Sequence, residues 1–322
     1  MNSGDAFPSS WYPVCASHQV SARRPLAVCI LGVAWIVFRG AEGRCVVVQR
    51  YCCHMGSDLA RGSVIDSFVR CPLHHWRFAG TGACVDIPGR TDIPANARLM
   101  TLRCEEHFGI VFVKHGDDDS IDYPIFADAG ELRYSRPRII RMAASYVTVS
   151  LNLFDVQHLV TVHQRVLTRP PEHFSDSVHH LGVRYSVENA RPRIGNHIAV
   201  LLGMSARDIR VDCWGGNLLL ISIKGSRPDF IMALAPVDPG NCRVFMATLD
   251  RARGGSAVAG IAQSMALELA ALLTRSFIAE DIKILSNSKT TAGVLLPDLD
   301  AGSLRFWEYF NSLPRSQPQS RQ

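Results

Sequence analysis

The segments Cys52-Cys53-His54 and, sixteen residues further on, Cys71-Pro72-Leu73-His74-His75-Trp76 contain the strongest signal in this chain. Each segment offers one cysteine and one histidine as a pair, at Cys-x-His and Cys-x-x-His spacing. Thiolate sulfur and neutral imidazole nitrogen are both good ligands for transition metals. The two segments therefore predict a metal site with mixed ligands, formed by Cys52, His54, Cys71 and His74.

The distribution of the ligands indicates which metal group is bound. Structural zinc sites use the same donors, but they usually pair Cys with Cys and His with His. A Rieske [2Fe–2S] centre needs one iron held by two cysteines and another held by two histidines. We therefore predict that Cys52 and Cys71 hold one iron and that His54 and His74 hold the other, with structural zinc as the alternative. Imidazole ligation raises the reduction potential, so such a centre accepts electrons from a ferredoxin-type donor.

Three neighbours of these ligands leave alternatives open. Cys53 could replace Cys52 as a ligand on spacing alone. Trp76 either covers the cluster or is an ordinary core tryptophan. His75 is not required as a ligand, because His74 already has the needed spacing.

Length and composition predict two domains in a cytoplasmic protein. A chain of 322 residues with 47% hydrophobic content is long enough for two ordinary cores. Its ten cysteines, without a secretory signal, are interpreted as reduced thiols and cluster ligands. Arg23-Arg24 before the apolar run Pro25 to Phe38 could open an export signal. That run is too short to span a bilayer, and Gly32 divides it into two β-prone pieces.

The charge pattern argues against nucleic-acid binding. The net charge is +5, and no dense block of lysine and arginine accompanies it. Arg133, Arg136, Arg138 and Arg141 do lie close together in the sequence. They form either a solvated linker face or a docking patch for an acidic ferredoxin or reductase.

We predict an α+β chain in which an N-terminal all-β Rieske domain precedes a domain of helices on an antiparallel sheet, of the helix-grip type. The boundaries are 11–114 for the Rieske domain, 115–143 for a polar connector, 144–312 for the catalytic domain and 313–322 for a disordered tail. Val- and Ile-rich segments predict the strands. They are Leu26–Leu31, Ala34–Phe38, Cys45–Gln49, Ile209–Cys213, Asn217–Ile223, Asp229–Val237 and Arg243–Asp250.

A second metal site is predicted early in the second domain. Asn152, Asp155 and His158 lie three residues apart and so would share one helical face. His163 comes five residues after His158, so both imidazoles reach one ion only if the helix ends, kinks or widens near 160–162.

Two histidines and a carboxylate form the facial triad of non-haem iron(II) oxygenases, which leaves positions open for O2 and substrate. The carboxylate comes after the apolar helix Ser256–Ile278, which is expected in the core and not across a membrane. We choose Asp281 as the third ligand to mononuclear iron with His158 and His163, and Glu280 as the alternative. Packing these helices on the sheet would enclose an apolar pocket beside the iron. The remaining histidines are expected in an exposed, irregular region and are not assigned as ligands: His173, His179, His180 and His197.

The chain resembles the Rieske non-haem iron oxygenases, specifically their catalytic α subunits. The resemblance rests on an ordered series of motifs that includes Trp11-Tyr12-Pro13-Val14, the cluster segments and the pattern Asn152/Asp155/His158/His163. Its motifs are closest to those of the aminopyrrolnitrin oxygenases, which are arylamine N-oxygenases. The motifs concerned are Cys71-Pro-Leu-His-His-Trp-Arg-Phe78, Cys84-Val-Asp-Ile-Pro-Gly89, Asp155-Val-Gln-His158 and Asp281-Ile-Lys-Ile284.

The resemblance implies a mechanism and an assembly. Electrons from NAD(P)H would pass through a separate ferredoxin or flavin reductase to the cluster and then to iron in a neighbouring subunit of a ring-shaped homotrimer. Asp155 would bridge His74 of one subunit to His158 of the next, and Asn152 would lie near the iron. Three positions depart from the family pattern, namely Leu151, Cys53 and Leu285. None of them removes a ligand, but Leu151 and Leu285 flank the active site and weaken any transfer of substrate identity.

The predicted function is that of a terminal oxygenase of secondary metabolism, a monooxygenase or related enzyme that uses O2 to oxidise a hydrophobic aromatic or polycyclic small molecule. N-oxygenation of an arylamine is preferred, and C–H hydroxylation or desaturation of a steroid-like or secondary-metabolite substrate is the alternative. A third hypothesis is a Rieske electron carrier without catalytic activity. Such a carrier would need only about the first 115 residues, so the intact second ligand set argues against it.

Overall fold

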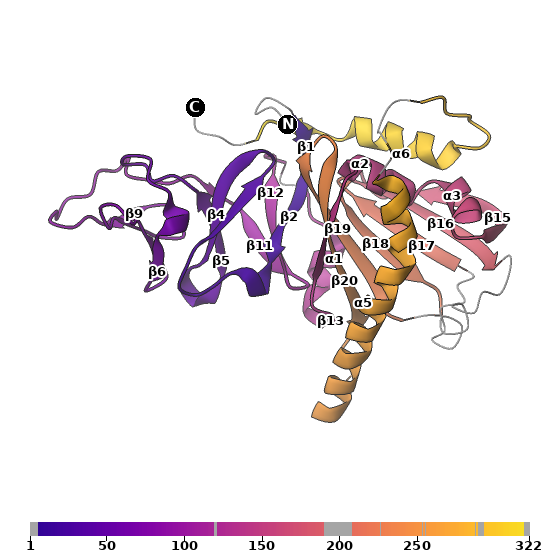
Figure 1. The fold of residues 1–322 in the computed structure, drawn as a ribbon, viewed down its shortest axis with the longest axis horizontal. Helices are drawn as coiled ribbons and strands as arrows, with labels where there is room; N and C mark the ends of the chain where they lie inside the picture. The colour runs from indigo at the N-terminus through magenta and orange to yellow at the C-terminus, as the bar shows by residue number, and fades with distance from the viewer. Residues whose placement is uncertain are drawn as a thin grey trace. The chain divides into compact units, whose positions relative to one another are not determined.

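The fold was analysed in a computed structural model that describes residues 6–118, 121–189, 208–225, 227–252, 254, 256–286, 288 and 293–318. The chain divides into two compact units (Figure 1). The first consists mainly of Trp11–Gly116 and the second mainly of Asp117–Arg315.

The first unit consists of short antiparallel strands in three sheets. The predicted meander is confirmed as β3 (Leu26–Ile30), β4 (Val33–Arg39) and β5 (Cys45–Gln49), extended at one edge by β10 (Thr101–Leu102). The second sheet contains β11 (Cys104–His107), β12 (Ile110–His115) and β2 (Ser10–Ala16). The third contains β6 (Ser63–Ile65), β7 (Phe68–Arg70), β8 (Arg77–Phe78) and β9 (Cys84–Asp86).

These sheets place a buried core directly beneath the two ligand segments. Cys52 and Cys71 belong to one cluster of buried side chains with Val48, Leu59 and Phe78. β5 leads into the first segment, and β7 and β8 flank the second. The ligand segments are therefore loops anchored at both ends by strands.

The second unit is built on one antiparallel sheet of 8 strands in the order β13-β20-β19-β18-β17-β16-β15, with β14 also paired to β20. The strands predicted from 209 to 250 are confirmed with small shifts at their ends. They are β17 (Asp208–Trp214), β18 (Leu218–Ile223), β19 (Asp229–Asp238) and β20 (Asn241–Arg251). Their single antiparallel sheet is as predicted.

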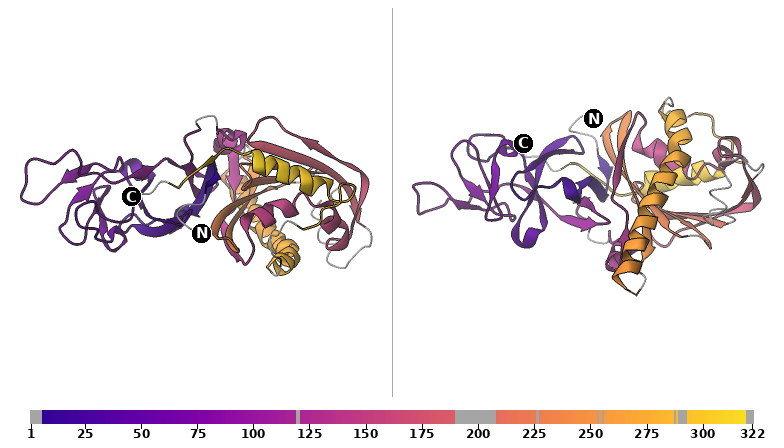
Figure 2. Two further views of the ribbon diagram at one scale, coloured as in Figure 1. Left: turned by 90° about the horizontal axis from the view of Figure 1, so that it is seen from above. Right: turned by 60° about the horizontal axis from the view of Figure 1, so that its bottom comes forward.

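Helices pack on this sheet and close its core (Figure 2). They are α2 (Tyr146–Asn152), α3 (Val156–Thr161), α5 (Ala257–Leu285) and α6 (Ala301–Ser312). Alternate residues of the strands, such as Val183, Val211 and Val244, pack with Val149 of α2 and Phe306 of α6. The α+β fold with helices on an antiparallel sheet is as predicted.

The region expected to be exposed and irregular instead contains two long strands, β15 (Arg165–Phe174) and β16 (His180–Asn189). His179 and His180 are buried, and His180 stacks on Trp214 with ring centroids 5.3 Å apart. Their expected exposure was wrong, because a carboxylate pairs with Nε2 of each ring: Asp118 lies 3.0 Å from His179 and Asp212 lies 3.0 Å from His180. His173 lies within β15, and His197 lies outside the described residues.

The segment expected to be a polar connector is also partly sheet. Its second half forms β13 (Leu132–Tyr134) and β14 (Arg138–Met142), which both pair with β20. Short helical turns precede them at α1 (Pro124–Ala127) and Asp128–Glu131. Polar composition concealed the strands because Arg138 and Arg141 interrupt the apolar residues of β14.

Three helix and terminus expectations also need correction. Asn152, Asp155 and His158 do not share one helix, because α2 ends at Asn152 and Asp155 is the N-cap of α3. The helix expected to end at Ile278 continues to Leu285, so Asp281 lies in its last turns and not beyond it. In the tail, β21 (Arg315–Ser316) pairs with β1 (Phe7–Pro8), so the expected disorder does not apply to those two residues.

The long helix α5 has two unlike faces. Gln263, Leu267 and Ala271 are buried, whereas Ile261 and Met265 are 62% and 69% exposed. Figure 1 shows its N-terminal end extending past the strands of the same unit. By length and composition α5 could cross a membrane, and only 22% of its apolar window is buried, although the core helix of a soluble protein passes the same test of length and composition. Its assignment as a core helix stays a prediction.

Candidate metal centres

The two ligand loops of the first unit have the same backbone pattern. In the first, the N–H of Gly56 donates to the carbonyl of Cys52, and in the second the N–H of His75 donates to the carbonyl of Cys71. Both turn residues have a left-handed backbone, with φ of 69° at Gly56 and 61° at His75. A side chain is rarely found in that conformation. Glycine would adopt this backbone at the position of His75 at no steric cost.

The cysteines and histidines of these loops are arranged in two layers. Cys52 and Cys71 are 4% and 2% exposed, and their thiols are close enough for a hydrogen bond. His54 and His74 are exposed, with ring centroids 4.8 Å apart. The arrangement matches a centre whose cysteine-held iron is buried and whose histidine-held iron faces solvent.

The environment of Cys52 supports metal binding. Burial raises the pKa of Cys52 to about 12, and the neighbouring Cys71 contributes to the increase. Such a thiol stays protonated unless a cation stabilises the thiolate. The donor set and its layering therefore fit a [2Fe–2S] cluster. Because Cys52 is the residue paired with Cys71, the geometry favours it over Cys53, although the ligand assignment stays a prediction.

Side chains around the first loop hold it in place. The Trp76 ring stacks on His54 with centroids 4.3 Å apart and an angle of 7° between the planes. Arg50 and Asp58 lie on either side of the loop and form a two-pronged ion pair, with N–O distances of 2.9 Å and 2.7 Å. The Arg50 guanidinium holds the pKa of the Asp58 carboxyl below its usual value. Trp76 thus covers the ring of His54, which we predict to be a cluster ligand.

The two histidines of the second site meet because α3 ends between them. The helix stops at Thr161, and the carbonyl of His158 accepts N–H bonds from both Val162 and His163, at 2.9 Å and 3.3 Å. The second of these is a widened turn of five residues. The expectation that the helix ends or widens before His163 is therefore confirmed.

His158, His163 and Asp281 form a compact group. One ligand atom from each lies within 4.8 Å of the others, and the His163 Nε2 atom is 3.1 Å from Asp281 Oδ1. The alternative carboxylate, Glu280, is exposed on α5. Two imidazoles and a carboxylate in such a group suit iron(II). The structure thus brings together the three predicted residues, and their role as iron ligands stays a prediction.

His158 is prepared for metal binding by its surroundings. Its Nδ1–H donates to the carbonyl of Asp155 at 2.6 Å, which leaves Nε2 available for the predicted metal. Burial lowers the pKa of His158 and so favours the neutral imidazole. The Asn152 amide nitrogen is 3.4 Å from Nε2 of His158, so Asn152 lies close to the site as predicted.

The Asp155 carboxylate has a local role that the sequence motif did not reveal. Its Oδ1 atom accepts the N–H groups of Gln157 and His158 at 2.8 Å and 3.3 Å, which caps the start of α3. Within the part of the chain that the structure describes, no hydrogen bond ends on Oδ2. Its predicted bridge between subunits lies outside what a single chain tests.

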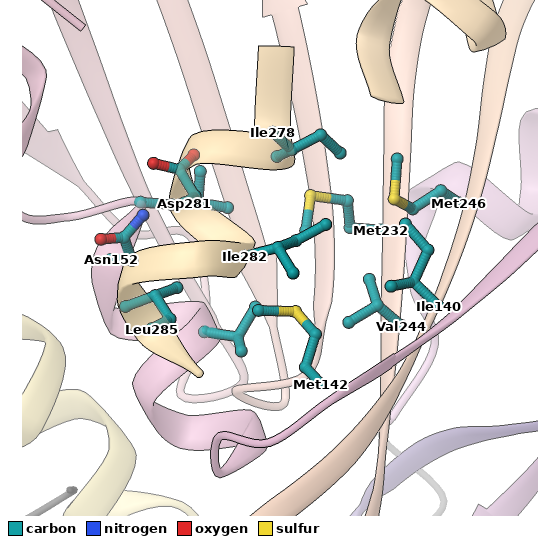
Figure 3. A pocket seen from close by; sticks show the side chains of 12 residues that line it. Ile140, Met142, Asn152, Met232, Val244, Met246, Ile278, Asp281, Ile282 and Leu285 are labelled. Carbon is teal, nitrogen blue, oxygen red and sulfur yellow. The ribbon is translucent and has the colours of Figure 1, made fainter. Parts of the chain in front are cut away.

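A pocket of about 390 Å³, a volume that includes space open to solvent, lies beside Asp281 (Figure 3). Leu285 lines this pocket, whereas Leu151 packs against the core of the unit. Sequence reasoning predicted an apolar pocket but missed three of its residues, Met142, Met232 and Met246. The alternation of Ile140 with Met142 and of Val244 with Met246 was the signal available, but the first pair fell in the presumed connector.

Residues 10–107 match the family model of the Rieske [2Fe–2S] domain. Aminopyrrolnitrin oxygenase PrnD from Pseudomonas fluorescens is 25% identical over 331 residues, which cover 94% of this chain and 90% of the relative. The protein is a Rieske-type oxygenase. Its homologues include terminal components of such systems.

Two further similarities bear on this Rieske-type oxygenase. Cholesterol 7-desaturase nvd from Bombyx mori is 30% identical over 196 residues, which cover 60% of this chain but only 41% of the relative. The structure of NdmA from Pseudomonas putida CBB5 with caffeine superposes with a TM-score of 0.73, at 18% identity, over 98% of this chain and 97% of that one. The second likeness shows that the oxygenase fold extends over both units.

Proposed function

We propose that this protein is the terminal oxygenase component of a Rieske system. It would use O2 and NAD(P)H electrons delivered by a ferredoxin or flavin reductase to oxygenate a hydrophobic aromatic or polycyclic molecule. The observation behind the proposal is that one chain contains two separate ligand sets, with an apolar pocket beside the second. A simple electron carrier would have no use for the second set or the pocket.

The residues of the chain have distinct parts in this proposal. Cys52, Cys71, His54 and His74 would hold the [2Fe–2S] cluster, which supplies single electrons. His158, His163 and Asp281 would hold the mononuclear iron, where O2 and electrons meet. The carbonyl of Asp155 keeps the His158 imidazole oriented, and the apolar wall of the pocket excludes water from the substrate.

N-oxygenation of an arylamine is the preferred reaction. Aminopyrrolnitrin oxygenase PrnD aligns over nearly the whole of this chain, whereas the nvd desaturase aligns over about three fifths of it. C–H hydroxylation or desaturation of a steroid-like or secondary-metabolite substrate is the second candidate, and the nvd similarity favours it. The protein is proposed to act in the cytoplasm.

A homotrimer is part of the proposal. Asp155 would link His74 of one subunit to His158 of the next. The carboxylate is suited to this because Oδ1 is used in capping α3, while Oδ2 has no hydrogen bond among the described residues.

The test is metal analysis followed by turnover. Anaerobically purified protein should contain about three irons and two sulfides per chain, with a Rieske-type electron paramagnetic resonance signal after reduction. His158→Ala should keep the cluster signal, lose about one iron and form no product from a screen of arylamines and polycyclic compounds. Zinc without sulfide, or undiminished product from His158→Ala, would disprove the proposal.

A further inference from the structure

One wall of the pocket beside Asp281 is made of methionines. Met142 comes from β14, Met232 from β19 and Met246 from β20. Met232 and Met246 are directly opposite each other in the antiparallel ladder. Figure 3 shows the three thioethers across the pocket from Asp281 and Asn152. All three side chains are largely buried, at 4%, 7% and 7% exposed, so they belong to the interior and not to the surface.

A thioether wall favours a particular kind of ligand surface. Sulfur is polarisable and makes favourable contacts with aromatic rings. The unbranched methionine side chain can also change rotamer to fit a flat molecule. The remaining apolar lining is aliphatic. Among the described residues of the lining, aromatic contacts would therefore involve sulfur and not another ring.

The charge of the lining is equally selective. None of the described residues that line the pocket is lysine, arginine or histidine, and its only ionisable member is Asp281. Asn152 is the other polar residue of the lining. An ionised carboxylate or sulfonate would thus be buried among apolar side chains, and no described residue of the lining offers a cationic side chain to pair with it. Such burial is costly.

We infer that the pocket accepts an uncharged aromatic ring and rejects aromatic anions, and that Met232 and Met246 are the residues that select the ring. The inference rests on the proposed function, because it assigns this pocket to the substrate. It narrows that function from hydrophobic molecules in general to uncharged aryl compounds. Met142 extends the same wall from β14, which pairs with β20, the strand that contains Met246.

The first experiment compares two ligands that differ in one substituent. Holoenzyme with both metal sites loaded is titrated calorimetrically, without O2, with 4-methylaniline and with toluene-4-sulfonate at pH 8. The uncharged amine should bind at least tenfold more tightly than the sulfonate. Equal affinity, tighter binding of the sulfonate or no binding of either compound would overturn the inference.

The second experiment tests the methionines. Met232→Leu and Met246→Leu conserve size and should weaken 4-methylaniline binding by about twofold to tenfold. They should change the affinity of 4-methylcyclohexanone, which is uncharged and has no aromatic ring, by less than twofold. Met265→Leu is the matched control, because Met265 is 69% exposed on α5 and far from the lining. If both pocket variants bind the amine as well as the wild type does, the methionines do not select the ring.

These titrations separate the inference from the function on which it rests. Iron and sulfide are measured on each sample before titration, so a missing metal site is detected as failure of the proposed function. A holoenzyme that forms product from arylamines but binds the sulfonate as tightly as the amine would refute the inference alone.

Discussion

The two predicted ligand sets of this protein are assembled in opposite ways. In the first unit, each of two loops contributes a cysteine and a histidine that are close in sequence, and both loops have the same hydrogen-bond pattern. In the second unit, His158 and His163 flank the end of a short helix, and Asp281 comes from a long helix much later in the chain. A local motif is thus sufficient for one set, whereas the other exists only when helices pack together.

The largest effect should come from a substitution in the second ligand set, which forms only when the helices pack together. Asp281→Ala should lose mononuclear iron and reduce product formation by at least about a hundredfold, because two imidazoles alone hold iron(II) weakly. Iron content and turnover are the measurements. Glu280→Ala is the matched control and should retain both, since Glu280 is exposed on the same helix. The opposite pattern would exchange the roles of the two carboxylates.

The local set can be tested in the same way with adjacent residues. Cys52→Ser should abolish the visible absorption and paramagnetic signal of the cluster, because Cys52 is buried beside Cys71. Cys53→Ser should leave both signals in place. Loss of the cluster in Cys53→Ser with retention in Cys52→Ser would show that the ligand is the neighbouring cysteine.

A smaller effect is expected at Asp155, which bears on whether the two sets cooperate. Asparagine caps helices about as well as aspartate, so Asp155→Asn should unfold within about 0.5 kcal/mol of the wild type. Removal of the charge should nevertheless slow electron delivery by about tenfold to a hundredfold, the usual cost of losing such a hydrogen-bonded partner. Single-turnover kinetics after reduction of the cluster would measure this rate. Unchanged kinetics with both metals present would remove the bridging role.

The smallest effect concerns the ion pair beside the first ligand loop. Asp58→Asn should destabilise the first unit by about 1 kcal/mol at pH 7, because it removes the pair with Arg50. The pKa of Asp58 is lowered in the folded protein, so the stabilisation is present above its unfolded pKa of about 4 and is lost as the pH falls through the folded pKa. The difference between variant and wild type should therefore shrink on acidification. Urea unfolding at several pH values measures it.

Asp66→Asn provides the comparison for that experiment. Asp66 also faces an arginine, Arg77, but at 3.9 Å and with 77% of its side chain exposed. Exposed pairs contribute little, so this variant should unfold like the wild type at every pH. An equal loss of stability in Asp58→Asn and Asp66→Asn would mean that the ion pair across the ligand loop stabilises the unit no more than an exposed ion pair does.

The sequence was sufficient to predict the structural features that depend on the local pattern of residues. The cluster segments, the meander before them and the four strands from β17 to β20 follow from spacing and from β-branched residues. The widened turn before His163 could be predicted because two side chains five residues apart do not lie on the same face of a regular α-helix. These features needed no knowledge of the rest of the fold.

The errors arose where tertiary contacts override local appearance. The sequence predicts that His180 is exposed, but its ring is buried and its Nε2 atom lies 3.0 Å from the buried carboxylate of Asp212. β14 was taken for part of a connector because Arg138 and Arg141 make it appear polar, yet pairing with β20 buries its last residue, Met142. Neither set of partners is adjacent in the sequence, so periodicity alone did not reveal them.

The pairing of β14 with β20 determines where this protein can be cut and rejoined. Ile140 and Met142 precede the start of the catalytic domain as the sequence suggests it, but they line the pocket beside Asp281. A chimera that replaces everything before residue 144 with another Rieske domain would discard part of the proposed substrate wall together with an edge strand. A junction near Asp117, where the second compact unit resumes after its short N-terminal piece, keeps that wall intact. If the Rieske domain is replaced in order to change the electron donor, we therefore expect the chimera to keep its substrate choice only when the junction lies near Asp117 and not at residue 144.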